Sequence, residues 1–110
     1  MENIRGSNTG VYVGFGDDSD YYEIINRIDN DFIDIAKTGN LRPIIASRLS
    51  YLWDLKGPSM IIDTSCSSSL VAVHVAGEAL RNHECDMAIA GGIKLSILPD
   101  KKQFKYWCRI

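Results

Sequence analysis

The sequence predicts an α/β layered domain. Three short apolar segments between turn residues have the pattern of strands: Gly10–Phe15, Ser59–Asp63 and Met87–Ala90. Longer apolar segments at helical spacing separate them, in the order strand, helix, helix, strand, helix, strand, which is typical of a sheet covered by helices. With 110 residues, 45% apolar and 24% charged, the chain has room for one such domain with a core and not for two.

The first strand is expected over Gly10–Phe15, where β-branched and aromatic residues alternate with glycine, and it ends at Gly14 or Gly16. Acidic residues then break the pattern. The segment Tyr22–Ala36 has isoleucines near helical spacing and predicts a helix, although polar residues weaken its middle.

A second helix is expected to begin at Pro43, because a residue without an N–H fits the first helical position. It runs to about Trp53 or Asp54, and Gly57-Pro58 stops it. Four apolar residues form its predicted buried stripe: Ile44, Ile45, Leu49 and Leu52.

The next segments predict a strand, a tight turn and a helix. Ser59–Asp63 has the pattern of a strand covered on both faces. Thr64-Ser65 then leads into Cys66–Asn82, whose apolar residues surround most of the helical wheel and predict a helix buried nearly all round. Met87–Ala90 is the last expected strand, closed by Gly91-Gly92.

The final residues are less informative. Ile93, Leu95 and Ile97 alternate with polar residues before Pro99, and the chain stops at Ile110 without capping or turn chemistry. Such an end resembles an interruption rather than a terminus.

Composition disfavours several classes of function. Twelve basic and fourteen acidic residues give a net charge of -2 without a basic stripe, so nucleic acid is a poor candidate partner. No apolar run approaches the ~20 residues that span a bilayer, and no signal peptide is evident, so we expect no membrane association and a cytoplasmic location. Three widely spaced cysteines, Cys66, Cys85 and Cys108, indicate free thiols rather than a disulfide framework or a metal site.

Cys66 is the residue best placed for chemistry. It lies where a predicted buried strand turns sharply into a helix, and the unpaired N–H groups at a helix start favour negative charge on a sulfur or on an attacked carbonyl oxygen. Small neighbours, Ser65, Ser67 and Ser68, leave a substrate room to approach. The arrangement is that of the nucleophile elbow with cysteine in place of serine. The alternative is that Cys66 is simply a small buried apolar residue.

The eight residues Asp63–Leu70 resemble the active-site signature of the condensing enzymes, Asp-Thr-Ala-Cys-Ser-Ser-Ser-Leu, with Ser65 as the one departure. Three further blocks, in the right order, are similar to β-ketoacyl synthases of the polyketide and fatty acid synthase group: Gly10–Gly14, Ala46–Tyr51 with Asp54–Ser59, and Glu84–Ala88 with Ala90–Gly92. The resemblance covers most of the chain and is weakest at Asp17–Lys37 and in the last ten residues.

The resemblance implies a thiolase-like layered fold, of which residues 1–110 would be an incomplete N-terminal half-domain. It implies a homodimer that condenses acyl units delivered on the phosphopantetheine of an acyl carrier protein, with no directly bound cofactor and no metal. In that family the cysteine, here Cys66, holds the acyl chain as a thioester, and the carbanion from a decarboxylated malonyl-type extender attacks it. The style of the motifs favours the modular polyketide or multifunctional fatty acid type.

The family's two histidine motifs do not occur in this sequence. His74 follows Cys66 by eight residues, roughly 12 Å along a helix, and is expected to be a core or interface residue. His83 lies at the polar exit of the same helix. We expect neither to act as base to the thiol, and we expect Cys85 and Cys108 to be non-catalytic.

Other candidate sites are weaker. Gly14-Phe15-Gly16 resembles a phosphate loop, but acidic residues follow where an anion would bind. The acidic residues are Asp17, Asp18 and Asp20. They suggest a calcium loop, but the later glycine and glutamate of such a loop do not follow them. Arg48 and Asp63 are expected to hold backbone groups or each other rather than substrate.

Two hypotheses follow. In the first, the parent protein is a ketosynthase with Cys66 as its acyl-accepting nucleophile. In the second, the polypeptide as given is a catalytically incompetent fragment that acts at most as a packing or interaction module. Because Met60–Asp63 and Leu70–Leu80 need covering layers on both sides, we also expect the fragment to be poorly stable alone and to self-associate.

Overall fold

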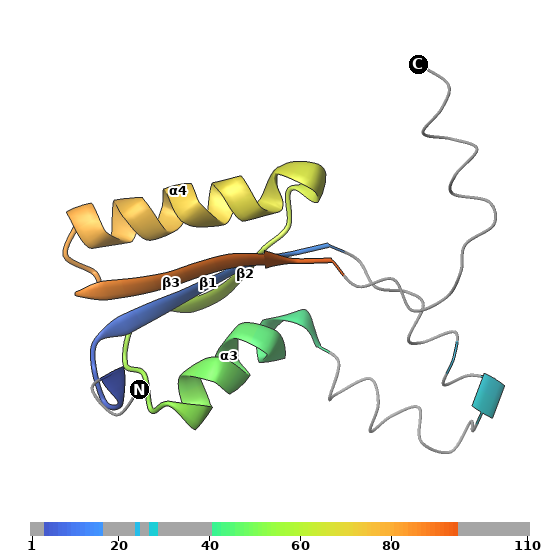
Figure 1. Ribbon diagram of the computed structural model, residues 1–110, viewed down its shortest axis with the longest axis horizontal. Coiled ribbons are helices and arrows are strands. Elements are labelled where there is room, and N and C mark those ends of the chain that lie inside the picture. Colours follow the sequence, from blue (N-terminus) through green and yellow to red (C-terminus); the bar gives the residue numbers. More distant parts are fainter. Residues whose placement is uncertain (1–3, 17–23, 25–26, 29–40, 95–110) are drawn as a thin grey trace.

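The computed structural model describes residues 4–16, 24, 27–28 and 41–94. Its elements are β1 (Thr9–Phe15), α3 (Arg42–Leu52), β2 (Ser59–Ile62), the 3-10 turn η2 (Ser65–Ser67), α4 (Ser68–Arg81) and β3 (Met87–Ile93). They form a three-stranded sheet with α4 on one face and α3 on the other (Figure 1). The predicted α/β layered architecture is confirmed.

The sheet is parallel and has the order β2-β1-β3, so the first strand of the chain lies in the middle. Val13 of β1 pairs with Ile61 of β2 and with Gly91 of β3. Since all three strands run the same way, their carboxyl ends meet at one edge of the sheet. In open α/β sheets this edge is where ligands usually bind.

The central strand β1 divides the core into two clusters because successive side chains point to opposite faces. Tyr12, fully buried, packs on the α4 side with Ala72 and Ala76. Val11 and Val13 pack on the α3 side with a set of apolar residues: Ala46, Leu55, Ile45, Leu49, Trp53, Ile61 and Ile89. The alternation explains why β1 reads as apolar throughout, as a strand covered on both faces must.

Small residues bring α4 close to the sheet. Its buried residues are Ser68, Ala72, Ala76 and Ala79. Two strand glycines lie under its first turn: a Cβ added to Gly14 would lie 2.6 Å from the backbone carbonyl carbon of Ser68, and one added to Gly92 would overlap with the Cβ of Ser69. The start of α4 is therefore held directly against the strands.

Helix α3 differs in two details from the prediction. It begins at Arg42, so Pro43 is its second residue rather than its first. Ile45 and Leu49 pack against the sheet as expected, but Leu52 is 64% exposed and does not belong to the buried stripe. Trp53, two turns after buried Ala46, closes the stripe instead.

The prediction that the helix after Cys66 is buried nearly all round is wrong for the described chain. Leu70 is 75% exposed and Val73 is 55% exposed, because only the alanine stripe faces the sheet. Strand β2 is likewise only partly covered: Ile61 and Ile62 pack on opposite faces, but Ser59 and Met60 are exposed.

The last predicted strand is longer than expected. β3 continues through Gly91 and Gly92 to Ile93 rather than closing at the glycines. Its pairing with β1 continues to Phe15, so the glycines are ladder residues and not a turn. At Gly92 a side chain would meet Ser69, which explains why glycine occupies a strand interior here.

Several predictions concern residues outside the described part of the chain. They are the acidic residues 17, 18 and 20, the helix over 22–36 apart from residues 24, 27 and 28, the alternation beyond residue 94, and Cys108. Among the described residues, no helix has the length and apolar character needed to cross a membrane.

Candidate active site: a thiol at a strand-to-helix turn

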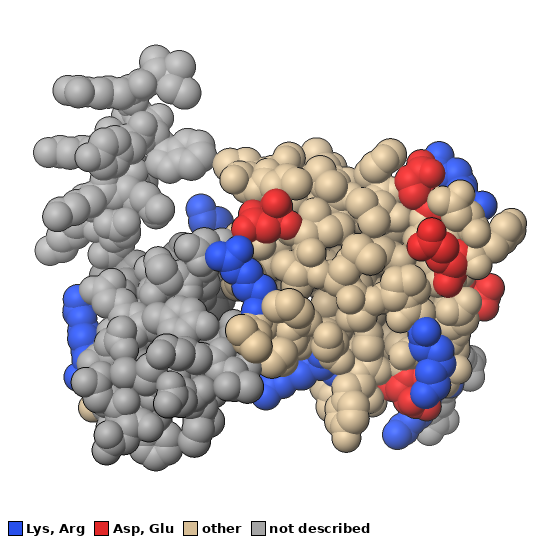
Figure 2. Space-filling model, turned by 180° about the vertical axis from the view of Figure 1, so that it is seen from behind, with Lys and Arg blue, Asp and Glu red and all other residues tan. Residues whose placement is uncertain are grey.

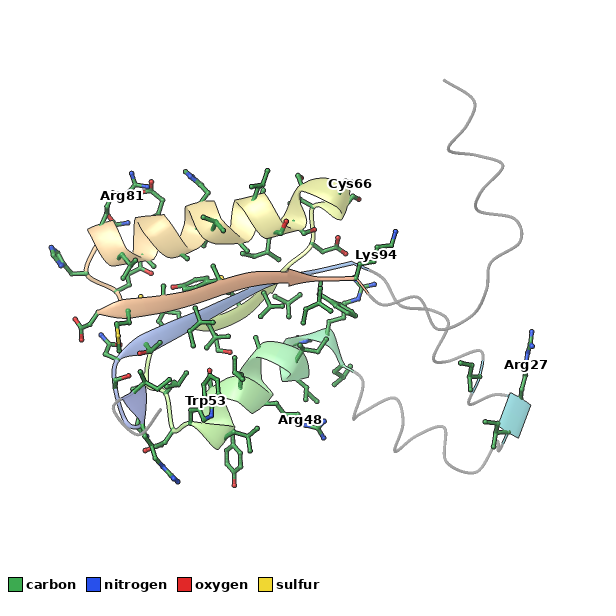
Figure 3. The ribbon with its side chains drawn as sticks, viewed as in Figure 1. Arg27, Arg48, Trp53, Cys66, Arg81 and Lys94 are labelled. Atoms are coloured by element: carbon green, nitrogen blue, oxygen red, sulfur yellow. The ribbon has the colours of Figure 1, made fainter. Side chains whose placement is uncertain are left out.

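Cys66 lies in the turn between β2 and α4, at the carboxyl edge of the sheet. It is the middle residue of η2, and its side chain is exposed. Lys94, which follows β3, lies at the same end of the molecule (Figure 3). The predicted strand-to-helix placement is thus correct, with one refinement: the α-helix begins two residues after the thiol, at Ser68.

The backbone before the thiol is in an uncommon conformation. Ser65 has a φ of 56°, in the left-handed region that non-glycine residues rarely adopt. A turn of this kind reverses the chain between β2 and α4 within very few residues. It projects Cys66 out of the structure rather than into the core, so the alternative of a small buried cysteine is wrong for Cys66.

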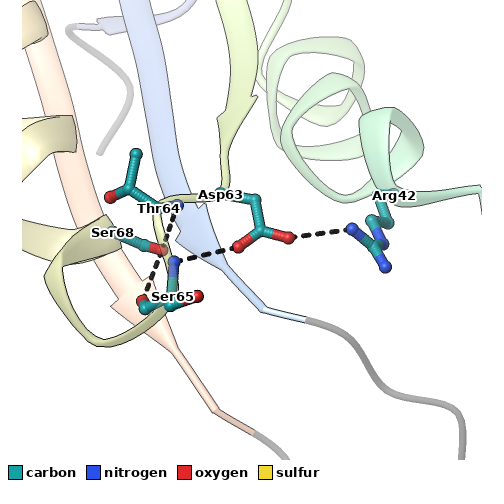
Figure 4. Close-up of polar contacts among 5 residues, drawn as sticks. All are labelled: Arg42, Asp63, Thr64, Ser65 and Ser68. Carbon is teal, nitrogen blue, oxygen red and sulfur yellow. Dashed lines mark hydrogen bonds and ion pairs between the residues drawn. The ribbon is translucent and has the colours of Figure 1, made fainter.

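Hydrogen bonds from the flanking residues hold this turn together (Figure 4). The Ser68 hydroxyl accepts from the backbone N–H of Thr64 at 2.8 Å and donates to the carbonyl of Ser65 at 2.7 Å. The Ser67 hydroxyl donates to the Thr64 carbonyl at 2.8 Å. Because Ser68 is buried and bonded on both sides, it fixes the turn to the first residue of α4.

Asp63 secures the other side of the turn. One carboxylate oxygen accepts from the backbone N–H of Ser65 at 3.2 Å, and the other pairs with the guanidinium of Arg42 at 2.9 Å (Figure 4). The expectation that Asp63 holds backbone groups is confirmed. Its cationic partner is Arg42 at the start of α3, whereas Arg48 is exposed on the far side of that helix (Figure 3).

The start of α4 provides the electrostatic setting. No side-chain hydrogen bond caps the helix at Ser67. The N-terminus of a 14-residue helix carries partial positive charge, and Cys66 directly precedes the capping position. Exposed Ser65 and Ser67 flank the thiol and leave it open to a reagent.

The other candidate residues lie away from the thiol. His74 and His83 are both exposed, His74 within α4 and His83 just beyond it. Of the two alternatives for His74, the core position is wrong for the described chain, and the interface position stays a prediction. Cys85 is 2% exposed and packs in the α4 cluster beside Tyr12, in keeping with a structural role.

Tyr12 is fully buried in that cluster. Burial raises the pKa of Tyr12 to about 12, and nearby Cys85 and Glu84 add to the shift. The contrast between buried Cys85 and exposed Cys66 makes the first a natural internal reference for the reactivity of the second.

Sequence reasoning missed Arg42 as a member of the site. Arg42 precedes Asp63 by 21 residues, and only the packing of α3 against β1 and β2 brings the two together. A lone arginine beside a proline gives no pattern from which this contact could be found. Within the described residues, no cluster of histidine, cysteine, aspartate and glutamate could hold a metal ion.

Comparison with known families gives a consistent result. Residues 1–104 match the family model described as beta-ketoacyl synthase, N-terminal domain. The chain is 50% identical over 99 residues to the hybrid PKS-NRPS synthetase pydA of an Acremonium species, covering 90% of this chain and 2% of the relative. It is 50% identical over 100 residues to fusarin C synthetase of Gibberella fujikuroi, covering 91% of this chain and 2% of the relative.

Solved structures agree in fold. The ketosynthase from module 6 of the bacillaene synthase of Bacillus subtilis has a TM-score of 0.73 and 37% identity, covering 96% of this chain and 16% of that chain. An oxazolomycin ketosynthase domain, OzmH KS7, from Streptomyces albus has a TM-score of 0.66 and 35% identity, covering 91% and 16%. The chain therefore spans a small part of each protein that it matches.

Proposed function

Because the chain belongs to the β-ketoacyl synthase family, through that family's N-terminal domain, we propose that it supplies the acyl-accepting segment of a ketosynthase, with Cys66 as the nucleophile. The thiolase-like fold class predicted from the sequence is confirmed by the ketosynthase structures that the chain resembles. The observation that carries the proposal is an exposed thiol in a tight turn at the start of a long helix.

The proposed first step is acyl transfer. The sulfur of Cys66 attacks the carbonyl carbon of an acyl thioester, the bond from that carbon to the donor sulfur breaks, and the donor thiol leaves with the proton lost by Cys66. The partial positive charge at the start of α4 favours negative charge that develops near the turn.

The proposed second step is condensation. A malonyl-type extender loses carbon dioxide, and the released electron pair forms a carbon–carbon bond to the acyl carbonyl carbon. The bond from that carbon to the Cys66 sulfur breaks, which releases the Cys66 thiolate and leaves a β-ketoacyl product on the extender's carrier. A proton from solvent then restores the thiol. Because the sequence lacks the family's histidine motifs, we expect acylation without condensation from the 110-residue chain alone.

The proposal includes partners and setting. Substrates arrive on the phosphopantetheine arm of an acyl carrier protein, the active protein is a homodimer, and no resident cofactor is required. Polyketide synthesis is favoured because the similar proteins include polyketide synthases such as dmxL2 of a Cryptosporiopsis species. A cytoplasmic location suits a nucleophile that must stay reduced.

Alkylation of the cysteines tests the site. The full-length protein that carries this chain is treated briefly with iodoacetamide under native conditions, and the modified peptides are mapped by mass spectrometry. We expect Cys66 to be labelled and Cys85 to be protected, because the first side chain is exposed and the second is 2% exposed. A control in denaturant should label both.

Labelling confined to Cys85 or Cys108 would overturn the assignment of Cys66. Complete labelling of Cys85 at the rate of Cys66 in native protein would contradict the fold that supports it.

A further inference from the structure

Three features of the described chain lie outside the thiol itself: the exposed apolar side of α4, the buried Tyr12–Cys85 pair and the Arg42–Asp63 ion pair. The Tyr12–Cys85 pair is enclosed in the core and does not reach the thiol. The ion pair reaches the backbone of the turn that carries Cys66.

We propose that Arg42, acting through Asp63, is a positioning residue that sets the turn in front of Cys66 for acyl transfer. The inference rests on the proposed function of Cys66 as the acyl acceptor. It assigns a role to a residue of α3, an element on the opposite side of the sheet from α4, the helix that follows the thiol (Figure 1).

The contacts form a continuous connection. The Arg42 guanidinium binds one oxygen of Asp63 at 2.9 Å, and the second oxygen accepts from the N–H of Ser65 at 3.2 Å. Ser65 directly precedes Cys66 and is the residue with φ at 56°. A conformation of this kind persists only where neighbouring groups hold it, so the bond to Ser65 bears directly on the direction in which Cys66 leaves the turn.

Exposure indicates that the pair directs geometry rather than holding the fold. The side chains of Arg42 and Asp63 are 41% and 38% exposed, and exposed ion pairs add little to global stability. The charge on Arg42 nevertheless orients the carboxylate, so that one of its oxygens is held toward the N–H of Ser65. Loss of Arg42 would leave Asp63 free to rotate away from the turn.

The test compares rates of acyl-thioester formation on Cys66 in the full-length protein, with an acyl-pantetheine thioester as donor. Arg42→Gln should lower the rate about tenfold or more, because small errors in positioning reduce rates steeply. Arg42→Lys keeps one cationic donor and should restore part of the rate. Arg81→Gln is the matched control: it removes an exposed arginine–carboxylate pair of the same 2.9 Å length, with Glu78, and should react like the unaltered protein.

A double-mutant cycle asks whether Arg42 acts through Asp63. Asp63→Asn removes the charge that Arg42 binds but keeps an oxygen acceptor for Ser65, so it should reproduce the effect of Arg42→Gln. The double variant should be no slower than either single variant. Additive losses would contradict the connection. Protection of Cys85 from iodoacetamide, measured on every variant, reports that the core has remained closed.

Each outcome bears on a distinct claim. If Cys66 is acylated equally fast in the unaltered protein and in Arg42→Gln, the positioning role is overturned while the proposed function stands. If the unaltered protein is not acylated at Cys66, both fail. If Arg42→Gln exposes Cys85, the decision rests on Arg42→Lys and Asp63→Asn, and a normal rate in Asp63→Asn with Cys85 protected overturns the proposal.

Discussion

At the scale of single residues, Ser65 carries the backbone strain of the site. Its φ of 56° costs a non-glycine residue roughly 1–2 kcal/mol, and the hydrogen bonds of Asp63 and Ser68 to its N–H and carbonyl offset that cost. The sequence offered only a hint of this feature, because serine is compatible with many turns. The strain is a property of the path that links β2 to α4.

Substitution at Ser65 should depend strongly on side-chain shape. Ser65→Val places a β-branched residue at positive φ and should destabilise the protein by about 1 kcal/mol or more. Ser65→Gly removes the steric cost but adds chain entropy to the unfolded state, so a change of less than about 1 kcal/mol is expected. Urea denaturation curves measure both values. Equal stability of the two variants would show that the left-handed turn is absent.

At the scale of elements, the distance between α4 and the sheet determines where the thiol lies. Gly14 and Gly92 leave no room for a Cβ beneath Ser68 and Ser69, so the start of α4 is in direct contact with β1 and β3. A side chain at either glycine must displace the start of α4. At Gly14 the opposing atoms belong to the backbone of Ser68 and Ser69, and at Gly92 the nearest atom is the Cβ of Ser69. A substitution at either glycine would therefore also shift the turn that bears Cys66.

Adjacent glycines in β3 give a matched test of this packing. Gly92→Ala should destabilise the protein by about 1–3 kcal/mol, the usual cost of overpacking, since the new methyl group would overlap with Ser69. Gly91→Ala should change stability little, because no atom lies within 4 Å of the added Cβ. Thermal or urea unfolding of the two variants checks the difference. A larger loss at residue 91 than at 92 would contradict the placement of α4 over β3.

The local hydrophobic pattern of the sequence predicted the positions of the strands and of the two described helices. It failed for features that tertiary contacts determine, such as the end of a strand or the burial of a helix end. Alternation located β1, and the apolar run before Asp63 located β2, because both depend on burial from two sides. The extension of β3 through Gly91 and Gly92 was not predictable, since glycine usually marks a turn and here it marks close approach of a helix. The exposed end of α3 at Leu52 was missed because helical periodicity does not reveal where the sheet ends.

The candidate site was predictable only where it depends on local sequence pattern. Cys66 stands at a junction between a strand pattern and a helix pattern, and that junction is visible in the sequence. Its supporting pair is not visible, because Arg42 and Asp63 meet only through the packing of α3 on the sheet. His74, predicted to lie in the core or at an interface, is exposed, because the buried residues of α4 are Ser68 and the alanines that face the sheet.

At the scale of the whole molecule, the described chain presents much apolar surface. Six of its exposed apolar residues lie on α4 or along the strands: Leu70, Val73, Leu80, Met60, Met87 and Ile93. Figure 2 shows a broad uncharged face with acidic and basic residues mainly at its margins. Such surface fits the small share, 16%, of the Bacillus ketosynthase that the chain spans. The expected low stability and self-association of the isolated chain stay predictions.

The Cys66 sulfur should become an acyl thioester, and mass spectrometry of the acylated protein tests this directly. The full-length protein is incubated with an acyl-pantetheine thioester, digested under conditions that preserve thioesters, and compared with a Cys66→Ala variant treated in the same way. We predict one acyl group on the peptide that contains Cys66 and none on that peptide in the variant. An unacylated Cys66, or the same acyl mass on another residue in both proteins, would contradict it.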